Sequence, residues 1–419
     1  MDFIGRLFKG DRVVWIIYLF LCLISIVEVY SASSTLIYKS GNHWGPITQH
    51  IVFLIVGSVV VWVVHNINYK WFQGLVVLVP VSLVMLLVVT CLGAMTNGAA
   101  RWMSLFGVQF QPSEFAKLAV VVTTAVILGK MQGEDGADPK AFKYIMWIAG
   151  ATCLAIAPEN LSTAMLLFGV VVLMMFVGRV PFRQWGKMLG IMALAGGLAV
   201  GTLTVIPKGV LQETPGLHRL GTWQNRIRSF VDETPVTPEA YDIDKNAQKA
   251  HANIAIASSH LIGKMPGNSV QRDFLSQAFS DFIFAIIIEE LGLIGGAFVV
   301  FLYVCLLLRA GKIARRAKGN FATFLVVGIA LILVSQAILN MMVAVGLFPV
   351  TGQPLPLISK GGTSTLINCV YIGMILSVSR YTMEQEAKLA TETVPEGGLQ
   401  PEEPSAQMLQ DVETDTKQA

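Results

Sequence analysis

The chain has 419 residues, of which 54% are hydrophobic and only 14% are charged. Soluble proteins average roughly 45–50% apolar and 25% charged residues, so this composition excludes an ordinary soluble domain. The net charge of +3 comes with no basic face interleaved with aromatic residues, which argues against a nucleic-acid-binding protein. We therefore expect a protein of the lipid bilayer.

About ten apolar runs are candidates for membrane-spanning helices, each of which needs about 20 mostly apolar residues. In chain order they cover residues 13–30, 50–64, 72–92, 115–129, 145–156, 161–177, 188–206, 282–308, 321–347 and 363–378. The run 145–156 is short and is separated from the next only by "APEN", so it is either half of a helical hairpin or has misjudged ends. The sequence therefore predicts an all-α polytopic membrane protein.

The basic residues of the short connections predict the orientation of these spans. With both termini in the cytoplasm, the inside segments hold Arg12, Lys70, Lys130, Lys140, Lys143, Arg179, Arg183, Arg315, Arg316 and Arg380, among others, whereas the short outside segments hold Lys39, Arg101, Lys117 and Lys360. This asymmetry follows the positive-inside rule. It places one long loop, about 207–280, outside the membrane between the seventh and eighth spans.

The C-terminal residues 382–419 differ in composition from the rest of the chain. They contain nine acidic residues and two lysines, with the Pro- and Gly-containing stretch "VPEGGLQPEEPS". Such a segment has too little apolar surface to offset the entropy of ordering. We therefore divide the chain into a membrane domain, 1–381, and a disordered acidic cytoplasmic tail, 382–419.

Three stretches on the outer side carry polar residues that topology does not require. The first, "NGAARWMSLFGVQFQPSEFAKLA" at 97–119, contains a turn signal at Asn97-Gly98 and a helix start with Ser113 as N-cap. Glu114 and Lys117 are three residues apart, so they share a helical face and can neutralise each other. The alternative to a functional site is a structural ion pair with an interfacial Arg101-Trp102 anchor.

The second stretch, "GLFPVTGQPLPLISKGGTSTL" at 346–366, cannot form a regular helix because Pro354 and Pro356 interrupt it. We expect a re-entrant or irregular segment buried in protein or lining a cavity, because lipid does not tolerate irregular backbone. Lys360 and the nearby hydroxyls would there hold an anionic group. A merely tight connection between two spans is the alternative.

The third stretch is "SDFIFAIIIEELG" at 280–292, which places three carboxylates in an apolar run. We expect Ser280 to cap a helix and Asp281 to lie in its first turn, where the helix dipole favours a negative charge. Glu289 should lie roughly 12 Å deeper and about 80° around the helix, so it cannot share a reacting atom with Asp281. A carboxylate that merely stabilises the helix end is the alternative for Asp281, and Glu289 and Glu290 fit a structural or proton-handling role.

Together the three stretches resemble the SEDS family (shape, elongation, division and sporulation), polytopic bacterial proteins that polymerise the cell-wall precursor lipid II. The matching segments are 97–102 with 111–117, 269–271 with 281–292, and 346–362, in the family's order. "VEVYSASSTL" and "VQFQPSEFAKLA" resemble the cell-division branch more than the elongation branch. Differences from the family's pattern include Phe279-Ser280 in place of His-Thr and Lys360 in place of Tyr, whereas Asp281 is retained.

The resemblance implies a glycosyltransferase that works at the outer face of the membrane. Its donor is a glycan linked to undecaprenyl pyrophosphate, and its acceptor is a sugar hydroxyl of lipid II. An inverting transfer needs one base near that hydroxyl and no carboxylate nucleophile, and Asp281 is our candidate for this base. The substrate-binding candidates are Arg101, Gln111, Glu114, Lys117, Arg219, Arg226, Arg228, Gln248, Ser269, Gln271, Ser359, Gly361 and Gly362.

Within this set, Arg101, Lys117 and the three arginines at 219–228 are candidates for the pyrophosphates, because Arg clamps phosphate oxygens and Lys supplies a point charge. The alternative for 219–228 is a basic segment lying on anionic head groups. No ligand spacing typical of a metal site is present, and all five cysteines fall in apolar runs. We expect no certain cofactor, and a requirement for a divalent cation such as Mg or Mn stays open.

Three functions from different classes remain: a lipid II polymerase acting in division or elongation, a lipid II flippase, and a scaffold of the division machinery without chemistry of its own. The resemblance implies a class B penicillin-binding transpeptidase and other divisome proteins as partners. It also implies a place in the bacterial cytoplasmic membrane, at the division septum.

Overall fold

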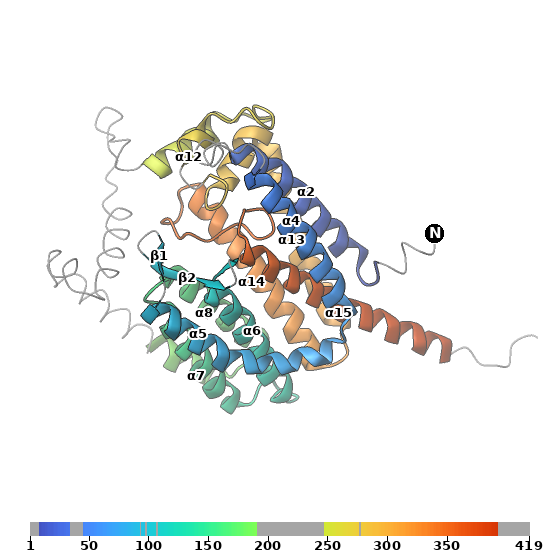
Figure 1. The fold of residues 1–419 in the computed structure, drawn as a ribbon. Coiled ribbons are helices and arrows are strands. Elements are labelled where there is room, and N and C mark those ends of the chain that lie inside the picture. The colour runs from blue at the N-terminus through green and yellow to red at the C-terminus, as the bar shows by residue number, and fades with distance from the viewer. Residues whose placement is uncertain are drawn as a thin grey trace, which may run out of the picture. The chain divides into compact units, whose positions relative to one another are not determined.

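The computed structural model describes residues 8–33, 45–92, 94–96, 99–105, 108–190, 247–275 and 278–392 (Figure 1). The chain divides into two units, Met1–Tyr381 and Thr382–Ala419. Helix α15 (Thr363–Glu392) begins in the first unit and ends in the second. The first eleven residues of the predicted disordered tail are therefore helical, because 382–392 consist largely of strong helix formers and contain no Gly or Pro.

Helices account for most of the first unit. They are α2 (Arg12–Ala32), α4 (Gly45–Asn66), η1 (Tyr69–Val77), α5 (Leu78–Leu92), α6 (Pro112–Lys130), α7 (Pro139–Ile156), α8 (Leu161–Val177), α12 (Ala247–Ala257), η3 (Gln271–Asp273), α13 (Ile283–Arg316) and α14 (Asn320–Ala344), followed by α15. Every predicted span except 188–206 falls on a described helix, and that run begins in a helical segment, 182–190. Helices α7 and α8 pack against each other across the short connection at "APEN", as expected of a helical hairpin.

With η1 and α5 counted as one span, Tyr69–Thr90, seven of the described helices are long and apolar enough to cross a membrane, and α8 is a shorter apolar helix. The class of a helical, multi-pass membrane protein is thus confirmed. The number of ten spans stays a prediction, because residues 191–246 lie outside the described part of the chain.

Three short strands join α5 to α6, a feature that the sequence analysis did not predict. β1 (Ala94–Thr96), β2 (Ala99–Leu105) and β3 (Val108–Phe110) form an antiparallel sheet in the order β1-β2-β3. Thr96 lies opposite Ala99, while Asn97 and Gly98, where we predicted a turn, lie outside the described residues. The ladder pairs backbone groups that a helix-to-helix connection would otherwise leave without partners.

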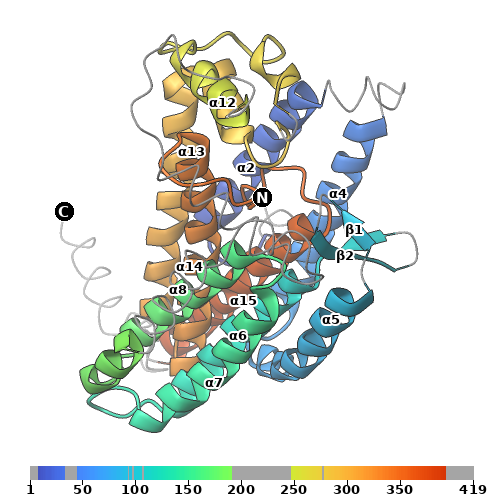
Figure 2. The same ribbon diagram turned by 90° about the vertical axis from the view of Figure 1, so that its left-hand side faces the viewer.

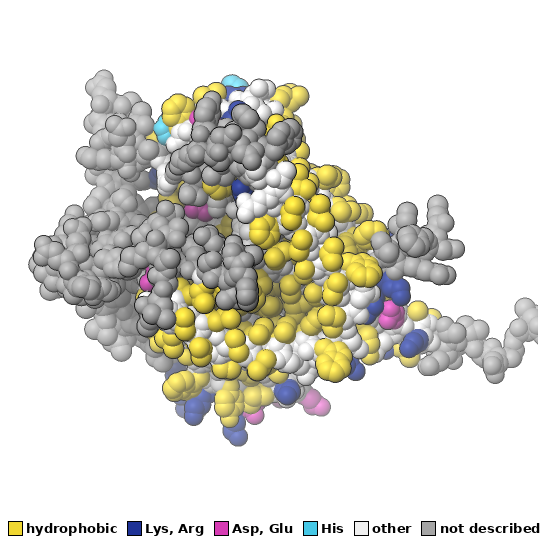
Figure 3. Space-filling model, viewed as in Figure 1, with side chains coloured by type: hydrophobic (Ala, Val, Ile, Leu, Met, Phe, Trp, Pro, Cys, Tyr) yellow, Lys and Arg dark blue, Asp and Glu magenta, His cyan; other side chains and the backbone are white. Residues whose placement is uncertain are grey.

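The distribution of side chains matches a protein that crosses a bilayer. Hydrophobic side chains cover much of the described part of the face seen in Figure 3, and basic ones gather at the end where α6 turns into α7. Exposed basic residues at the connections of that end are Lys130, Lys140, Lys143, Arg179 and Arg183. Helix α12 lies at the opposite end in both ribbon views (Figures 1 and 2). The positive-inside rule therefore puts the α12 end outside.

Helix α13 reverses direction at Gly292, where φ is 75° and ψ is −176°. A Cβ atom added to Gly296 would lie 3.7 Å from Cζ of Phe284 and 2.8 Å from Cγ1 of Ile288. In a straight helix residues 284 and 296 would be about 18 Å apart along the axis, so the two halves of α13 fold against each other. Residues 283–291 form a short half-helix, and 293–316 form the long half.

The connection at 260–265 supplies backbone partners to both helix ends at this reversal. The N–H groups of Lys264 and Met265 donate to the carbonyls of Glu289 and Glu290, at 2.9 and 2.8 Å. The N–H groups of Leu293 and Ile294 donate to the carbonyls of His260 and Leu261. Helix ends normally leave such groups without intrahelical partners, so this connection makes the reversal compatible with burial.

Candidate active site

The connection between α14 and α15 passes among the helices and not beyond their ends (Figure 2). Leu355, Leu357, Ile358 and Ser359 are at most 2% exposed. Gln336 of α14 donates to the carbonyl of Pro354 at 3.0 Å, Tyr303 of α13 donates to that of Pro356, and Ser25 of α2 donates to that of Ile358 at 2.6 Å. The predicted buried, irregular segment is therefore confirmed, and we call 353–360 the re-entrant segment.

Asp281 lies in a turn that this re-entrant segment holds in place. The N–H of Lys360 donates to the carbonyl of Phe279 at 3.0 Å, and the Ser359 hydroxyl donates to that of Ser280 at 2.7 Å. Asn340 of α14 donates from Nδ2 to the carbonyl of Asp281 at 2.9 Å. Three successive carbonyls are thus fixed, which sets the direction of the Asp281 side chain.

The local structure around Asp281 differs from our expectation. Helix α13 begins at Ile283, with Phe282 as N-cap and no side-chain cap, so Ser280 does not cap it and Asp281 precedes the first turn. The Ser280 hydroxyl donates instead to Oδ1 of Asp281 at 3.1 Å. The cause is that the carbonyls of Phe279, Ser280 and Asp281 are held in a turn by other segments. The Asp281 side chain is half-buried.

The depth order of the three carboxylates is the reverse of our expectation. Glu290 accepts from Ser31, near the end of α2 at Ala32, whereas the re-entrant segment beside Asp281 takes its bond from Ser25. Ser25 and Ser31 are six residues apart, or about 9 Å along the helix. Asp281 is therefore the deeper group, because the half-helix 283–291 runs outward before the chain reverses at Gly292.

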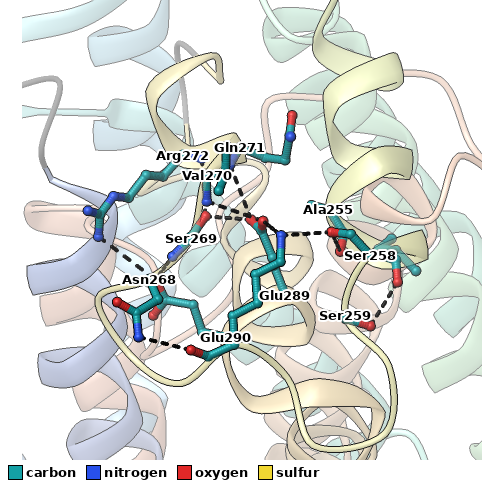
Figure 4. Close-up of polar contacts among 12 residues, drawn as sticks. Ala255, Ser258, Ser259, Asn268, Ser269, Val270, Gln271, Arg272, Glu289 and Glu290 are labelled. Carbon is teal, nitrogen blue, oxygen red and sulfur yellow. Dashed lines mark hydrogen bonds and ion pairs between the residues drawn. The ribbon is translucent and has the colours of Figure 1, made fainter.

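Glu289 and Glu290 anchor residues 258–275, which follow α12 and which we call the outer connection, to the fold (Figure 4). Glu289 lies 2.6 Å from Nζ of Lys264 and accepts from the Ser269 hydroxyl and from the N–H groups of Val270 and Gln271. Glu290 accepts from the N–H of Ser269 at 3.1 Å, and Nη1 of Arg272 lies 3.9 Å away. These contacts support the structural role that was one expectation for the two glutamates and identify their cationic partners.

Glu114 and Lys117 form the ion pair that their spacing predicts, with 2.8 Å between Oε1 and Nζ. The Lys117 side chain is fully buried and also donates to Oε1 of Gln336 at 2.9 Å. Because Gln336 holds the carbonyl of Pro354, the pair supports the re-entrant segment. Helix α6 begins at Pro112 with Gln111 as N-cap, so Ser113 is not the cap; the fixed φ of proline suits the first helical position.

The other predicted binding residues are spread over several elements. Arg101 lies on β2, and Gln248 is half-buried on α12. Ser269 and Gln271 both bind Glu289, and Oε1 of Gln271 lies 2.7 Å from Nδ1 of His251. Gly361 and Gly362 directly precede α15, and Gly362 has a φ of 52°. Arg219, Arg226 and Arg228 lie outside the described residues.

Ser359 and Lys360 differ in what they can offer a ligand. The hydroxyl of Ser359 gives its single proton to the Ser280 carbonyl and accepts from the N–H of Leu355 at 2.7 Å, so no proton is left for a ligand. Nζ of Lys360 lies 6.0 Å from the centre of the Phe279 ring. Lys360 is therefore the cation of this segment that stands beside the Asp281 turn.

Sequence reasoning did not identify the residues that hold the site together. These are Ser25, Tyr303, Gln336 and Asn340, all buried and drawn from α2, α13 and α14. A usable signal existed for two of them, because Gln336 and Asn340 are four residues apart in an apolar run and so share a face. Within the described part of the chain no three His, Cys, Asp or Glu side chains lie together so as to hold a metal ion.

Comparison of the chain with known proteins assigns it to a family. The family model of FtsW, RodA and SpoVE, described as cell cycle protein, matches residues 11–384. The chain belongs to the FtsW/RodA/SpoVE family. This confirms the SEDS resemblance over nearly the whole chain outside the tail.

Relatives and solved structures of the FtsW/RodA/SpoVE family agree with that assignment. The probable peptidoglycan glycosyltransferase FtsW of Halomonas elongata is 34% identical over 87% of this chain and 89% of its own length. That of Trichlorobacter lovleyi is 32% identical over 89% and 94%.

Two solved structures share the fold at 22% identity. One, reported under "Structural coordination of polymerization and crosslinking by a peptidoglycan synthase complex", covers 89% of this chain and 98% of its own at a TM-score of 0.69. The rod shape determining protein RodA of Thermus thermophilus, as its D255A mutant, covers 88% and 97% at 0.61.

Proposed function

We propose that this chain, a peptidoglycan glycosyltransferase of the FtsW/RodA/SpoVE family, polymerises lipid II at the outer face of the cytoplasmic membrane with Asp281 as general base. The observation that carries the proposal is the turn at 279–281. Three bonds from the re-entrant segment and α14 fix its backbone, and the half-buried carboxylate is left on a rigid support.

The chemistry requires one such group. Asp281 takes the proton from the acceptor sugar hydroxyl as that oxygen attacks the anomeric carbon of the donor glycan. The bond from that carbon to the undecaprenyl pyrophosphate breaks, and the pyrophosphate leaves with the bonding electrons. A positioned base of this kind contributes about 10²–10⁴-fold to the rate. Glu289 and Glu290 of α13 are already engaged by Lys264 and Arg272, which supports Asp281 acting alone.

The leaving pyrophosphate needs positive charge nearby, which is most effective where water is excluded. Lys360 supplies a cation next to the Asp281 turn. Its backbone N–H is bonded to the carbonyl of Phe279, which keeps the residue beside that turn. Arg101, and Arg219, Arg226 and Arg228 of the outer loop, remain candidates for the same task. A requirement for Mg or Mn also remains a proposal to be tested.

The proposed role in division and the proposed partners are inferred from the relatives. Curated relatives named FtsW support a place at the septum over an elongation role like that of RodA. The structural neighbour from a synthase complex that polymerises and crosslinks supports a class B penicillin-binding transpeptidase as partner. Other divisome proteins follow from the same reasoning.

Polarity along α15 argues against a lipid II flippase. Its outer half carries the buried polar residues Thr363, Ser364, Asn368 and Tyr371. The next turn consists of Ile372, Gly373, Met374, Ile375 and Leu376, and the four side chains among these are fully buried. A flippase needs a polar path to the inner leaflet, whereas on this helix a fully buried apolar turn separates the outer polar residues from Ser377 and Ser379, which are also buried.

Purified protein in liposomes tests the proposal. With labelled lipid II in the outer-facing leaflet, with and without the transpeptidase partner and Mg²⁺ or Mn²⁺, we expect glycan polymers on a gel and no transfer of lipid II between leaflets. Transfer without polymer would establish the flippase. Neither polymer nor transfer under any of these conditions would leave a scaffold role and refute the polymerase.

A further inference from the structure

A buried histidine contacts the Ser25 hydroxyl that holds Ile358 of the re-entrant segment. Nε2 of His50, on α4, lies 2.8 Å from the hydroxyl oxygen of Ser25, on α2. The same hydroxyl lies 2.6 Å from the carbonyl oxygen of Ile358. His50 is 1% exposed and Ser25 is fully buried, so water does not compete for either bond.

Counting protons fixes the direction of both bonds. A carbonyl oxygen only accepts, so the single proton of the Ser25 hydroxyl is donated to Ile358. The bond between Ser25 and His50 must then use a proton on Nε2. His50 thus donates to Ser25, and Ser25 donates to Ile358, which gives the pair one direction from α4 to the re-entrant segment.

Without the donor at His50 the hydroxyl of Ser25 has another choice. A serine within a helix readily turns its hydroxyl back to the carbonyl four residues earlier, which here is that of Leu21. The donor at His50 occupies the hydroxyl oxygen from one side and leaves its proton directed at Ile358. The imidazole therefore selects the Ser25 rotamer in which the hydroxyl donates to the carbonyl of Ile358.

The re-entrant segment needs the bond from Ser25 because its backbone is strained. Leu357 has a φ of 65°, a region that is costly for a non-glycine residue and persists only where surrounding contacts enforce it. Its neighbour Ile358 is held by Ser25, and the next two residues hold the turn of Asp281, Ser359 through its hydroxyl and Lys360 through its N–H. Ser25 is thus linked to the turn of Asp281 through three consecutive residues, Ile358, Ser359 and Lys360.

We propose that His50 is a positioning residue for the glycosyl transfer, acting on Asp281 through Ser25 and the re-entrant segment. It touches neither the substrate nor the reacting atoms. The inference rests on the proposed polymerase function, which it deepens by naming a residue that sets the geometry of the base.

Kinetics of glycan formation from lipid II, together with thermal unfolding, test the role of the donor. His50→Leu removes the donor at similar volume, whereas His50→Gln restores an N–H near the position of Nε2. We expect His50→Leu to lower kcat about tenfold or more with KM within about twofold, since small misplacements of catalytic groups cost up to 10²-fold. His50→Gln should recover at least half of the wild-type kcat.

A second histidine of α4 supplies the matched control. His65 is also 1% exposed, but it lies at the other end of the helix with Nδ1 2.7 Å from the carbonyl of Trp62. His65→Leu should leave kcat unchanged. If His50→Leu keeps the wild-type kcat, or if His50→Gln is no better than His50→Leu, the histidine merely fills space and the proposal is wrong.

Ser25→Ala carries the test if His50→Leu fails to fold. It should reproduce the loss of kcat, and a wild-type kcat in Ser25→Ala would overturn the proposal. Where His50→Leu does fold, the double variant should lose no more than either single one, because both substitutions act through the Ser25 hydroxyl. Additive losses would contradict the proposal.

Hydrogen exchange at the amides of Leu355, Ser359 and Lys360 gives a readout that needs no activity. It should accelerate in Ser25→Ala and not in His65→Leu. Wild-type protein without polymerase activity would refute the proposed function, whereas unchanged exchange in Ser25→Ala would refute the coupling itself.

Discussion

Lys117 shows how this protein keeps an ammonium group inside a membrane domain. Its side chain is fully buried, yet Nζ lies 2.8 Å from Glu114 and 2.9 Å from Gln336, so both charges of the pair are compensated. Gln336 passes the constraint on to the carbonyl of Pro354. The pair therefore stabilises the wall of the site and has less freedom to bind a mobile phosphate.

This arrangement predicts that Lys117→Met destabilises the fold by about 3–5 kcal/mol, because it leaves the carboxylate of Glu114 buried without a partner. Glu114→Gln combined with Lys117→Met should recover most of that loss. Thermal unfolding in detergent measures both. An unchanged melting temperature in Lys117→Met with a raised KM for lipid II would instead assign Lys117 to substrate binding.

Contacts between individual side chains were predictable where the spacing of the residues along one helix is enough to determine them. The three-residue separation of Glu114 and Lys117 on one helix face was enough to predict their pairing. Both predicted serine caps were wrong, because Pro112 set the start of α6 and side chains from distant segments set the turn before α13. Capping by a side chain competes with such long-range bonds, which a local pattern does not contain.

At the level of elements, the reversal of α13 determines where the carboxylates lie. Gly292 adopts backbone angles that essentially only glycine tolerates, and an added Cβ would lie 2.3 Å from the carbonyl oxygen of Leu261. The half-helix 283–291 can then run outward beside the long half. Without this reversal Asp281 could not lie beside the re-entrant segment.

We therefore predict that Gly292→Ala destabilises the protein by more than the roughly 1–3 kcal/mol that the backbone region alone costs. Gly311→Ala on the same element is the matched control, because an added Cβ there meets nothing within 4 Å and alanine favours a helix by about 0.5–1 kcal/mol. Melting temperatures of the two variants should move in opposite directions. Equal stability of both variants would contradict the reversal.

The reversal was not predictable from periodicity, because both halves are apolar and the run 282–308 contains no proline. The irregular segment at 346–362 was predictable, since Pro354 and Pro356 exclude a helix there. The three strands at 94–110 were missed because they are short and adjoin long apolar runs. Local breakers are visible in a sequence, whereas a turn that depends on the connection at 260–265 is not.

At the scale of the whole molecule, composition and the basic connections were sufficient for the class of protein. Exposed hydrophobic side chains cover its lateral face, and the basic connections lie at the end opposite α12. The site itself draws on α2, α4, α6, α13, α14 and the re-entrant segment, which are far apart in sequence. Only the family resemblance connected Asp281 with the 346–362 stretch before the structure did.

The central claim is that Asp281 is the base of a lipid II polymerase, and the kcat of Asp281→Asn tests it most directly. Asp273→Asn is the matched control, because that carboxylate is about half exposed on the outer connection. We expect Asp281→Asn to keep the wild-type melting temperature and to lose roughly 10²–10⁴-fold in kcat, while Asp273→Asn stays near wild type. A folded Asp281→Asn variant that polymerises lipid II at the wild-type rate would contradict the account.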